Sequence, residues 1–243
     1  MKHARQPCLL AVLAACLIAA TPGAATSAPR IVHLGNSRTT IAQEPLPAVQ
    51  AERAYLLIGG FGDEVHGIMH SLASRLRQLQ SAPVAYYHWH AGRPDLPGEG
   101  LQSIAGAIAS FRQRNPGADL VLIGHSLGAG SALRLAAMLP PGQGRLFLIT
   151  LDPIDRSCRP ERPASLNWWG NAYITESRSG YDFLLAAGGR WNACSAADVN
   201  LRFDGRRQDE RGQLYIHDRA DAMLFSRTLG PSLYERLLTA MQP

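Results

Sequence analysis

The sequence predicts an α/β protein with a mostly parallel central sheet and helices on both faces, and two observations support this prediction. From Arg53 onward, short apolar runs alternate with stretches whose apolar residues recur at helical spacing. Strands that are apolar on both faces are typical of parallel sheets covered by helices on both sides. Glycine, serine and aspartate follow several of these runs, at the carboxyl ends where such sheets bind ligands.

The predicted elements follow one another in a regular order from residue 54. The first strand, 54–58, precedes a helix over 65–79 in which Ile68, Leu72 and Leu76 share a face. Prolines and glycines end several helices, as at 140–142 after the helix 126–139. The other strands are expected at 83–89, 120–124, 145–151, 171–175 and 198–203, and the other helices at 98–114 and 220–241, the last of them broken near Gly230.

The composition fits one domain with a sizeable core. The chain has 243 residues, of which 46% are hydrophobic. Its 24 Lys and Arg residues exceed the 19 Asp and Glu residues by five, and without Lys2 and Arg5 the balance is 22 against 19, or +3. Basic and acidic residues are mixed along the chain, so we expect no nucleic-acid partner. Lys2 is the single lysine, which excludes a lysine base in a chain that has lost its leader.

The first 28 residues predict an export signal. Lys2 and Arg5 precede an apolar run at 8–20, and small residues follow at 21–28. This run is shorter than a membrane span requires, so we expect no stable span in the mature chain. Cleavage after Ala25 or Ala28 would give a periplasmic or secreted protein. Residues 13–16 also resemble a lipoprotein signal, in which lipidated Cys16 would anchor the chain to a membrane.

After the signal, residues 29–52 are interpreted as an N-terminal arm, with an edge strand at 30–34, and residues 53–243 as the main folded domain. This domain contains Cys158 and Cys194, which we expect to pair in an oxidising compartment. Two unpaired buried thiols are the alternative. The wide spacing and the absence of a C-x-x-C pattern argue against a zinc or redox site.

The most informative motif is the Gly-x-Ser-x-Gly turn at 124–128, between an apolar strand and an apolar helix. This strand–turn–helix context indicates a nucleophile elbow centred on Ser126. Glycines on both sides let the strand and the helix approach one another closely. The backbone N–H of Leu127, at the start of the helix, would then point to where an oxyanion forms. A helix-capping serine in a glycine-rich turn is the alternative interpretation.

A serine hydroxyl needs a base, and if the triad follows the chain order serine, acid, histidine, that base is His217, the only histidine after Ser126. His217 follows a strand-like stretch at 213–216, so we expect it in a strand-to-helix loop. The acid that orients it is expected to be Asp152, which ends the strand 145–151 next to Pro153. Other acids keep an alternative open: Asp155, Glu176, Asp182 and Asp198.

A second oxyanion donor is expected from the Gly-Gly-Phe-Gly stretch at 59–62, which follows the first strand. The Phe61 N–H is the first candidate and Gly60 the second. His125 is expected to be structural, because its side chain should point away from the Ser126 hydroxyl. His88 and His90 alternate along one strand, but no third ligand lies nearby in sequence, so we expect no metal.

With these motifs the chain resembles the α/β-hydrolase superfamily, and within it small lipase-like and esterase-like serine hydrolases. The elbow at 124–129, Leu-Asp-Pro at 151–153, the stretch 59–62 and the late His217 carry this resemblance over residues 53–243. It implies an α/β-hydrolase fold, a Ser126–Asp152–His217 triad, an acyl-serine intermediate and small-molecule or lipid ester substrates, with no cofactor. A thioesterase, a peptidase or a non-catalytic binding protein on the same fold are the alternatives.

Overall fold

The computed structural model describes residues 41–88, 99–155, 161–176 and 188–242. They all belong to the second of two units into which the chain divides, Ile41–Pro243. Six parallel strands form one sheet in the order β2-β1-β3-β4-β5-β6. Their bounds are β1 Arg53–Ile58, β2 Val84–Tyr87, β3 Asp119–His125, β4 Leu146–Leu151, β5 Trp168–Thr175 and β6 Val199–Asp204. The predicted α/β class with a parallel sheet is therefore confirmed.

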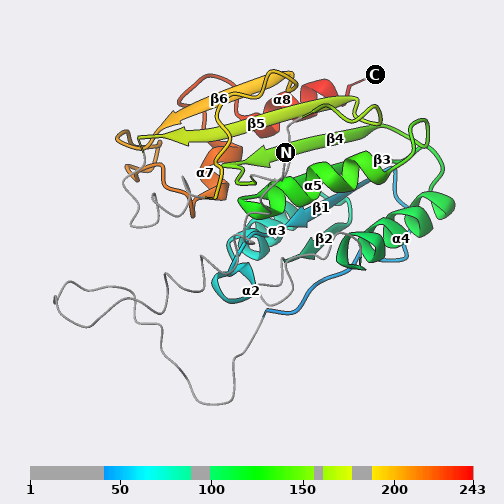
Figure 1. Cartoon of the computed structure of the whole chain (residues 1–243). Helices are drawn as coiled ribbons and strands as arrows, with labels where there is room; N and C mark the ends of the chain where they lie inside the picture. The colour runs from blue at the N-terminus through cyan, green and yellow to red at the C-terminus, as the bar shows by residue number, and fades with distance from the viewer. Residues whose placement is uncertain (1–40, 89–98, 156–160, 177–187, 243) are drawn as a thin grey trace, which may run out of the picture. The chain divides into compact units, whose positions relative to one another are not determined.

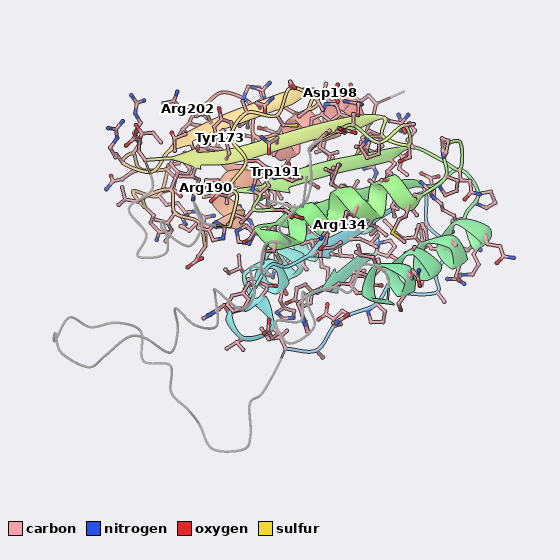
Figure 2. The ribbon with its side chains drawn as sticks, viewed as in Figure 1. Arg134, Tyr173, Arg190, Trp191, Asp198 and Arg202 are labelled. Carbon is pink, nitrogen blue, oxygen red and sulfur yellow. The ribbon has the colours of Figure 1, made fainter. Side chains whose placement is uncertain are left out.

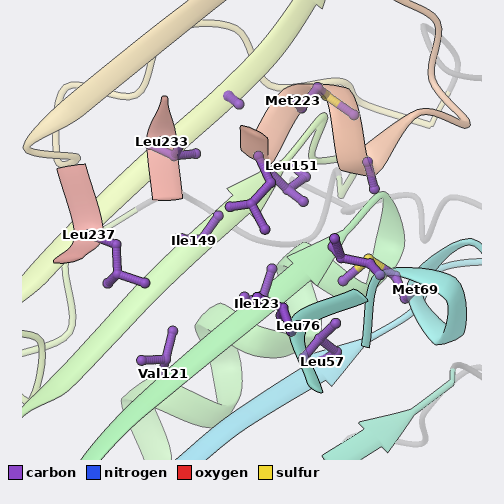
Figure 3. Packing of buried hydrophobic residues seen from close by; sticks show 14 of the residues in the cluster. Leu57, Met69, Leu76, Val121, Ile123, Ile149, Leu151, Met223, Leu233 and Leu237 are labelled. Carbon is purple, nitrogen blue, oxygen red and sulfur yellow. The ribbon is translucent and has the colours of Figure 1, made fainter. Parts of the chain in front are cut away.

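Helices cover the two faces of this sheet, and the sheet separates the core into two layers (Figure 1). One layer lies under α4 (Glu99–Arg114) and α5 (Leu127–Met138). The other lies under α3 (Ile68–Leu79), α7 (Ala220–Phe225) and α8 (Leu233–Ala240), and Figure 3 shows its side chains. Alternate residues of one strand face different layers: in β3, Val121 and Ile123 belong to the second layer, while Leu120 and Leu122 belong to the first. This alternation is why the central strands are apolar throughout.

The helix predicted over 65–79 is two helices, α2 (Asp63–His66) and α3. Gly67 separates them, because its φ of 65° lies in the left-handed region, where a helix cannot continue. The pattern of apolar residues is continuous across this break, so hydrophobic spacing alone could not locate it. The helical region predicted at 220–241 is likewise interrupted between α7 and α8, as expected near Gly230.

The strand-like stretch at 213–216 is not a strand of the sheet, and this prediction is wrong. Leu214 forms only an isolated antiparallel bridge with Gln208, and its side chain is exposed. The segment turns back on itself at Gly212, whose φ is 73°, rather than joining the edge of β6. His217 therefore lies in a loop between this turn and α7.

Both edges of the sheet differ from its centre. At β2, Glu44 of the arm exchanges two backbone hydrogen bonds of 2.8 Å with Tyr86, as one antiparallel bridge. At β6, Leu201 and Phe203 are buried, whereas Asn200 and Arg202 are exposed. The first edge is thus closed by a short piece of the arm, and the second carries polar side chains on one face.

Several predictions fall outside the described residues: the signal at 1–28, Cys16, the strand at 30–34, His90, Cys158 and Asp182. Cys194 is buried in the layer under α4 and α5, and its pairing with Cys158 stays a prediction. Among the residues that the structure describes, no helix combines the length and the apolar character needed to cross a membrane.

Candidate active site

Ser126 lies between β3 and α5 in a strained backbone conformation. Its φ of 57° and ψ of −128° are rare for a residue with a side chain. Small residues make the turn possible: a Cβ at Gly124 would lie 2.5 Å from Ala129 Cα, and one at Gly128 would lie 2.2 Å from the Ile58 carbonyl oxygen. The glycines of the motif therefore allow the helix to approach the ends of β1 and β3.

The Ser126 backbone is bound directly to the turn that follows β4. Its N–H donates to the Leu151 carbonyl at 3.0 Å, and its own carbonyl accepts from the Ile154 N–H at 3.2 Å. Asp152 lies between these two contacts, with a φ of 39°. The serine and the aspartate are thus held on neighbouring turns at the carboxyl ends of adjacent strands.

Asp152 forms a short hydrogen bond with His217. The Nδ1 atom of His217 lies 2.7 Å from Asp152 Oδ2, and the aspartate is fully buried. The other oxygen, Oδ1, accepts from the Ile174 N–H at 3.2 Å. Burial opposes ionisation, but the hydrogen bond from His217, its charge, the charge of Arg190 and the Ile174 amide together hold the pKa of the Asp152 carboxyl below its ordinary value.

His125 supports the ring of His217 from the residue just before Ser126. The two imidazoles stack with centroids 4.6 Å apart, and His125 Nε2 donates to the His217 carbonyl at 2.8 Å. Burial, followed by the nearby His217, lowers the pKa of His125 to about 3, so its ring is neutral. This agrees with the expectation of a structural role, and it adds a specific partner, His217, that the sequence did not suggest.

The described residues include three alternative candidates for the acid of the triad, and none of them is seen to contact His217. Asp155 forms an ion pair with Arg134 of α5. Asp198 pairs with Arg162 at 2.8 Å and accepts from the Trp169 N–H at 2.8 Å. Glu176 follows β5 with an exposed side chain and a φ of 56°. Asp152 is therefore the candidate acid that the geometry joins to His217.

The expected oxyanion loop lies against the serine. A methyl group at Gly60 would be 2.6 Å from Ser126 Cβ and 3.0 Å from its Oγ, so the Gly60 backbone passes directly beside the hydroxyl. Phe61 follows with a side chain that is 55% exposed. Leu127 is the first residue of α5, next to Ser126. The Gly60 backbone and the start of α5 therefore both lie next to Ser126.

Asp63 anchors this loop, and its role was not anticipated. Its buried carboxylate accepts from the Tyr86 hydroxyl at 2.6 Å and from the Met69 N–H at 3.0 Å. Burial, and then the hydrogen bond to Asp63, raises the pKa of Tyr86, so the phenol remains a donor. The aspartate ends the Gly-Gly-Phe-Gly-Asp stretch, where it could have been recognised as a turn anchor.

Comparison with known proteins finds only distant structural similarity. No protein-family model and no curated protein matches the chain. Among solved structures, the chain is similar to an esterase domain from a Rhodothermus marinus protein, with 14% identity over 73% of this chain and 86% of that one, and a TM-score of 0.40. It is also similar to a provisionally assigned hydrolase of the α/β superfamily from Xanthomonas campestris pv. campestris, with 17% identity over 62% and 86% of the two chains and a TM-score of 0.35.

These likenesses are too distant to carry an argument about function, so the assignment of the fold rests on this chain itself. Its six parallel strands follow the order β2-β1-β3-β4-β5-β6. A strained serine joins the third strand to a helix, and helices cover both faces. The chain has an α/β-hydrolase fold.

Proposed function

We propose that this protein is an exported serine hydrolase that cleaves carboxylic esters through an acyl-serine intermediate. The observation that carries the proposal is the 2.7 Å contact between His217 Nδ1 and Asp152 Oδ2, in a turn hydrogen-bonded to the Ser126 backbone. Nucleophile, base and acid of a triad need this arrangement, in which the acid orients the base through Nδ1. The proposal also matches the elbow geometry of Ser126.

In the proposed reaction, the Ser126 hydroxyl attacks the ester carbonyl while Nε2 of His217 takes its proton. Asp152 holds the imidazole by Nδ1 and stabilises the imidazolium that forms. The oxyanion would rest on the amides of Leu127 and of Phe61 or Gly60. The imidazolium then returns its proton to the leaving alcohol, and water releases the acyl group by the same steps in reverse order.

A fluorophosphonate probe followed by peptide mapping tests the nucleophile. We expect the probe on Ser126 in the folded wild type and none on Ser126→Ala. Turnover of p-nitrophenyl esters should fall by at least about 10³-fold in Ser126→Ala and His217→Ala, with unchanged circular dichroism. A folded wild type that takes up no probe and turns over no ester would refute the proposal and favour a binding protein.

A panel of substrates tests which type of bond and which acyl length the enzyme prefers. Esters of increasing acyl length separate an esterase from a lipase, and a thioester and a peptide amide test the rival reactions. Export is tested separately by measuring the mass of the mature chain. A start after Ala25 or Ala28 supports cleavage of a simple signal, whereas a lipidated N-terminal Cys16 supports membrane anchoring.

A further inference from the structure

The Asp152 carboxylate, which orients His217 in the proposed mechanism, also contacts the guanidinium of Arg190. The Arg190 Nη2 atom is 2.9 Å from Asp152 Oδ2, the same oxygen that His217 Nδ1 contacts at 2.7 Å. The Arg190 side chain is 16% exposed and that of Asp152 is fully buried. The carboxylate is therefore shared between a permanent cation and an imidazole that can gain or lose its charge.

The backbone around Arg190 is tied to the turn that carries Asp152. Arg190 forms an antiparallel bridge with Ile154, and the Trp191 N–H donates to the Pro153 carbonyl at 2.9 Å. The Trp191 indole donates to the Asp155 carbonyl at 3.0 Å, and the Asp155 N–H donates to the Gly189 carbonyl at 3.1 Å. Contacts on both sides of Arg190 thus direct its side chain to Asp152.

We propose that Arg190 is a positioning residue of the triad: it holds the Asp152 carboxylate and, by its fixed charge, opposes uptake of a proton by His217. This inference rests on the proposed function. A lone buried carboxylate strongly favours the imidazolium form of its partner, which cannot act as a base. An adjacent guanidinium offsets part of that field, so less of it acts on the imidazole.

Among the described residues, few other charges face His217. Asp152 faces it from the end of β4, and the neutral ring of His125 faces it from β3. Its neighbour in sequence Asp218 is exposed, and Arg219 is bound to Asp209. Among these groups, Arg190 is the cation in direct contact with the carboxylate that orients the base.

The pH profile of kcat/KM for a short-chain p-nitrophenyl ester tests this role. In Arg190→Met the acid limb should move about one pH unit higher, because the full charge of Asp152 then favours the imidazolium. Arg190→Lys keeps the charge and should restore most of the wild-type profile. KM should be unchanged in both variants, since Arg190 acts through Asp152 rather than through the substrate.

Arg134→Met is the matched control. Arg134 also pairs with a buried aspartate, Asp155, but it comes from α5 rather than from the segment after β5, as Figure 2 shows. Its loss should leave the acid limb in place. An equal displacement in Arg134→Met and Arg190→Met would overturn the proposal, because any nearby positive charge would then suffice.

Titration of the His217 ring by nuclear magnetic resonance separates this inference from the proposed function. The measurement needs no substrate, so it stands even if the wild type hydrolyses no ester. We expect the midpoint of the His217 titration to rise in Arg190→Met and in Arg190→Gln, which keeps an amide donor near Asp152 and protects the fold. A wild-type midpoint in a folded Arg190→Gln variant contradicts the role of the charge.

Discussion

Among the residues that the structure describes, the non-glycine residues with a positive φ are Ser126, Asp152 and Glu176. Each of them directly follows a strand: Ser126 follows β3, Asp152 follows β4 and Glu176 follows β5. Such conformations cost roughly 1–3 kcal/mol each and persist where the surrounding structure enforces them. Two of the three belong to the candidate active site, so the strain at single residues coincides with the proposed chemistry.

The identity of the acid can be tested at the residue scale. Asp152→Asn should lower kcat for ester hydrolysis by about 10³–10⁴-fold, because an amide no longer selects the required tautomer of His217. Glu176→Gln and Asp155→Asn, measured beside it at pH 7.5, should keep near-normal kcat. If Glu176→Gln were the inactive variant, the acid would lie after β5 instead of β4.

The buried His125 predicts a loss of stability in mild acid. Its pKa is about 3 in the folded protein, against 6.5 for an exposed ring, so between these values the unfolded chain binds one more proton. Stability is therefore complete above about pH 6.5 and falls as the pH decreases toward 3, with a loss of about 2 kcal/mol at pH 5.

Urea unfolding at pH 7.5 and pH 5 measures this effect. His125→Gln can still donate from its amide to the His217 carbonyl but does not titrate, so its stability should change less between the two pH values. A wild type and a variant that lose the same free energy of unfolding would show that other groups cause the acid sensitivity.

The main residues of the candidate site could be predicted from the sequence, but the residues that hold them in place could not. Ser126 has a local motif, and chain order points to His217 as the base. Arg190 and His125 have no such signal, because their importance depends on contacts between distant segments: 38 residues separate Arg190 from Asp152. Sequence spacing contains no information about which loop folds back onto a given turn.

At the scale of elements, the packing of α5 against β1 depends on the absence of a side chain at Gly128. In most helices Gly→Ala is stabilising, since alanine has the higher helix propensity. Here the added Cβ would lie 2.2 Å from the Ile58 carbonyl oxygen and 2.6 Å from that of Gly59. These are backbone atoms, so Gly128→Ala should lower the free energy of unfolding by about 1–3 kcal/mol.

Gly106 of α4 provides the matched control, because nothing lies within 4 Å of the position of its Cβ. Gly106→Ala should raise stability by about 0.5–1 kcal/mol in the same urea titration. Gly128→Ala should also reduce the proposed esterase activity, because α5 cannot shift without moving Ser126. A stable, fully active Gly128→Ala variant would contradict the close approach of α5 to β1.

The elements themselves were predictable where hydrophobic pattern and local turns agree. The six strands of the sheet were all expected within a few residues of their observed bounds: β1 to β5 are mostly buried runs, and β6 alternates buried apolar with exposed polar residues. The break at Gly67 and the loop at 213–216 were not, since both depend on backbone conformation. The run of apolar residues at 214–216 resembles a strand, yet the neighbouring turn at Gly212 directs the chain away from the sheet.

At the scale of the whole molecule, the arm at 41–52 protects an edge of the sheet. Besides the Glu44–Tyr86 bridge, the Ile41 N–H donates to the Glu64 carbonyl at 2.8 Å and the Ala51 N–H donates to Asn115 Oδ1 at 2.8 Å. The Glu44 carboxylate also pairs with Arg77 and His70. An exposed edge strand readily pairs with another chain, so loss of the arm should promote association.

Two truncated chains test this function of the arm. A chain that begins at Ile41 should remain monodisperse, because every arm contact described here is retained. A chain that begins at Arg53 should be less stable and should aggregate on heating, as followed by light scattering. Equal behaviour of the two chains would show that β2 needs no cover.

The chain order of the sheet has a consequence for synthesis. The first three strands occupy one half of the sheet, and β4, β5 and β6 then add outward one at a time. Sixty-five positions separate Asp152 from His217, and the histidine comes after the last strand. A nascent chain would therefore carry the proposed nucleophile long before the proposed base, and a polypeptide whose synthesis stops before codon 217 would be unable, under this proposal, to attack the cell's own esters.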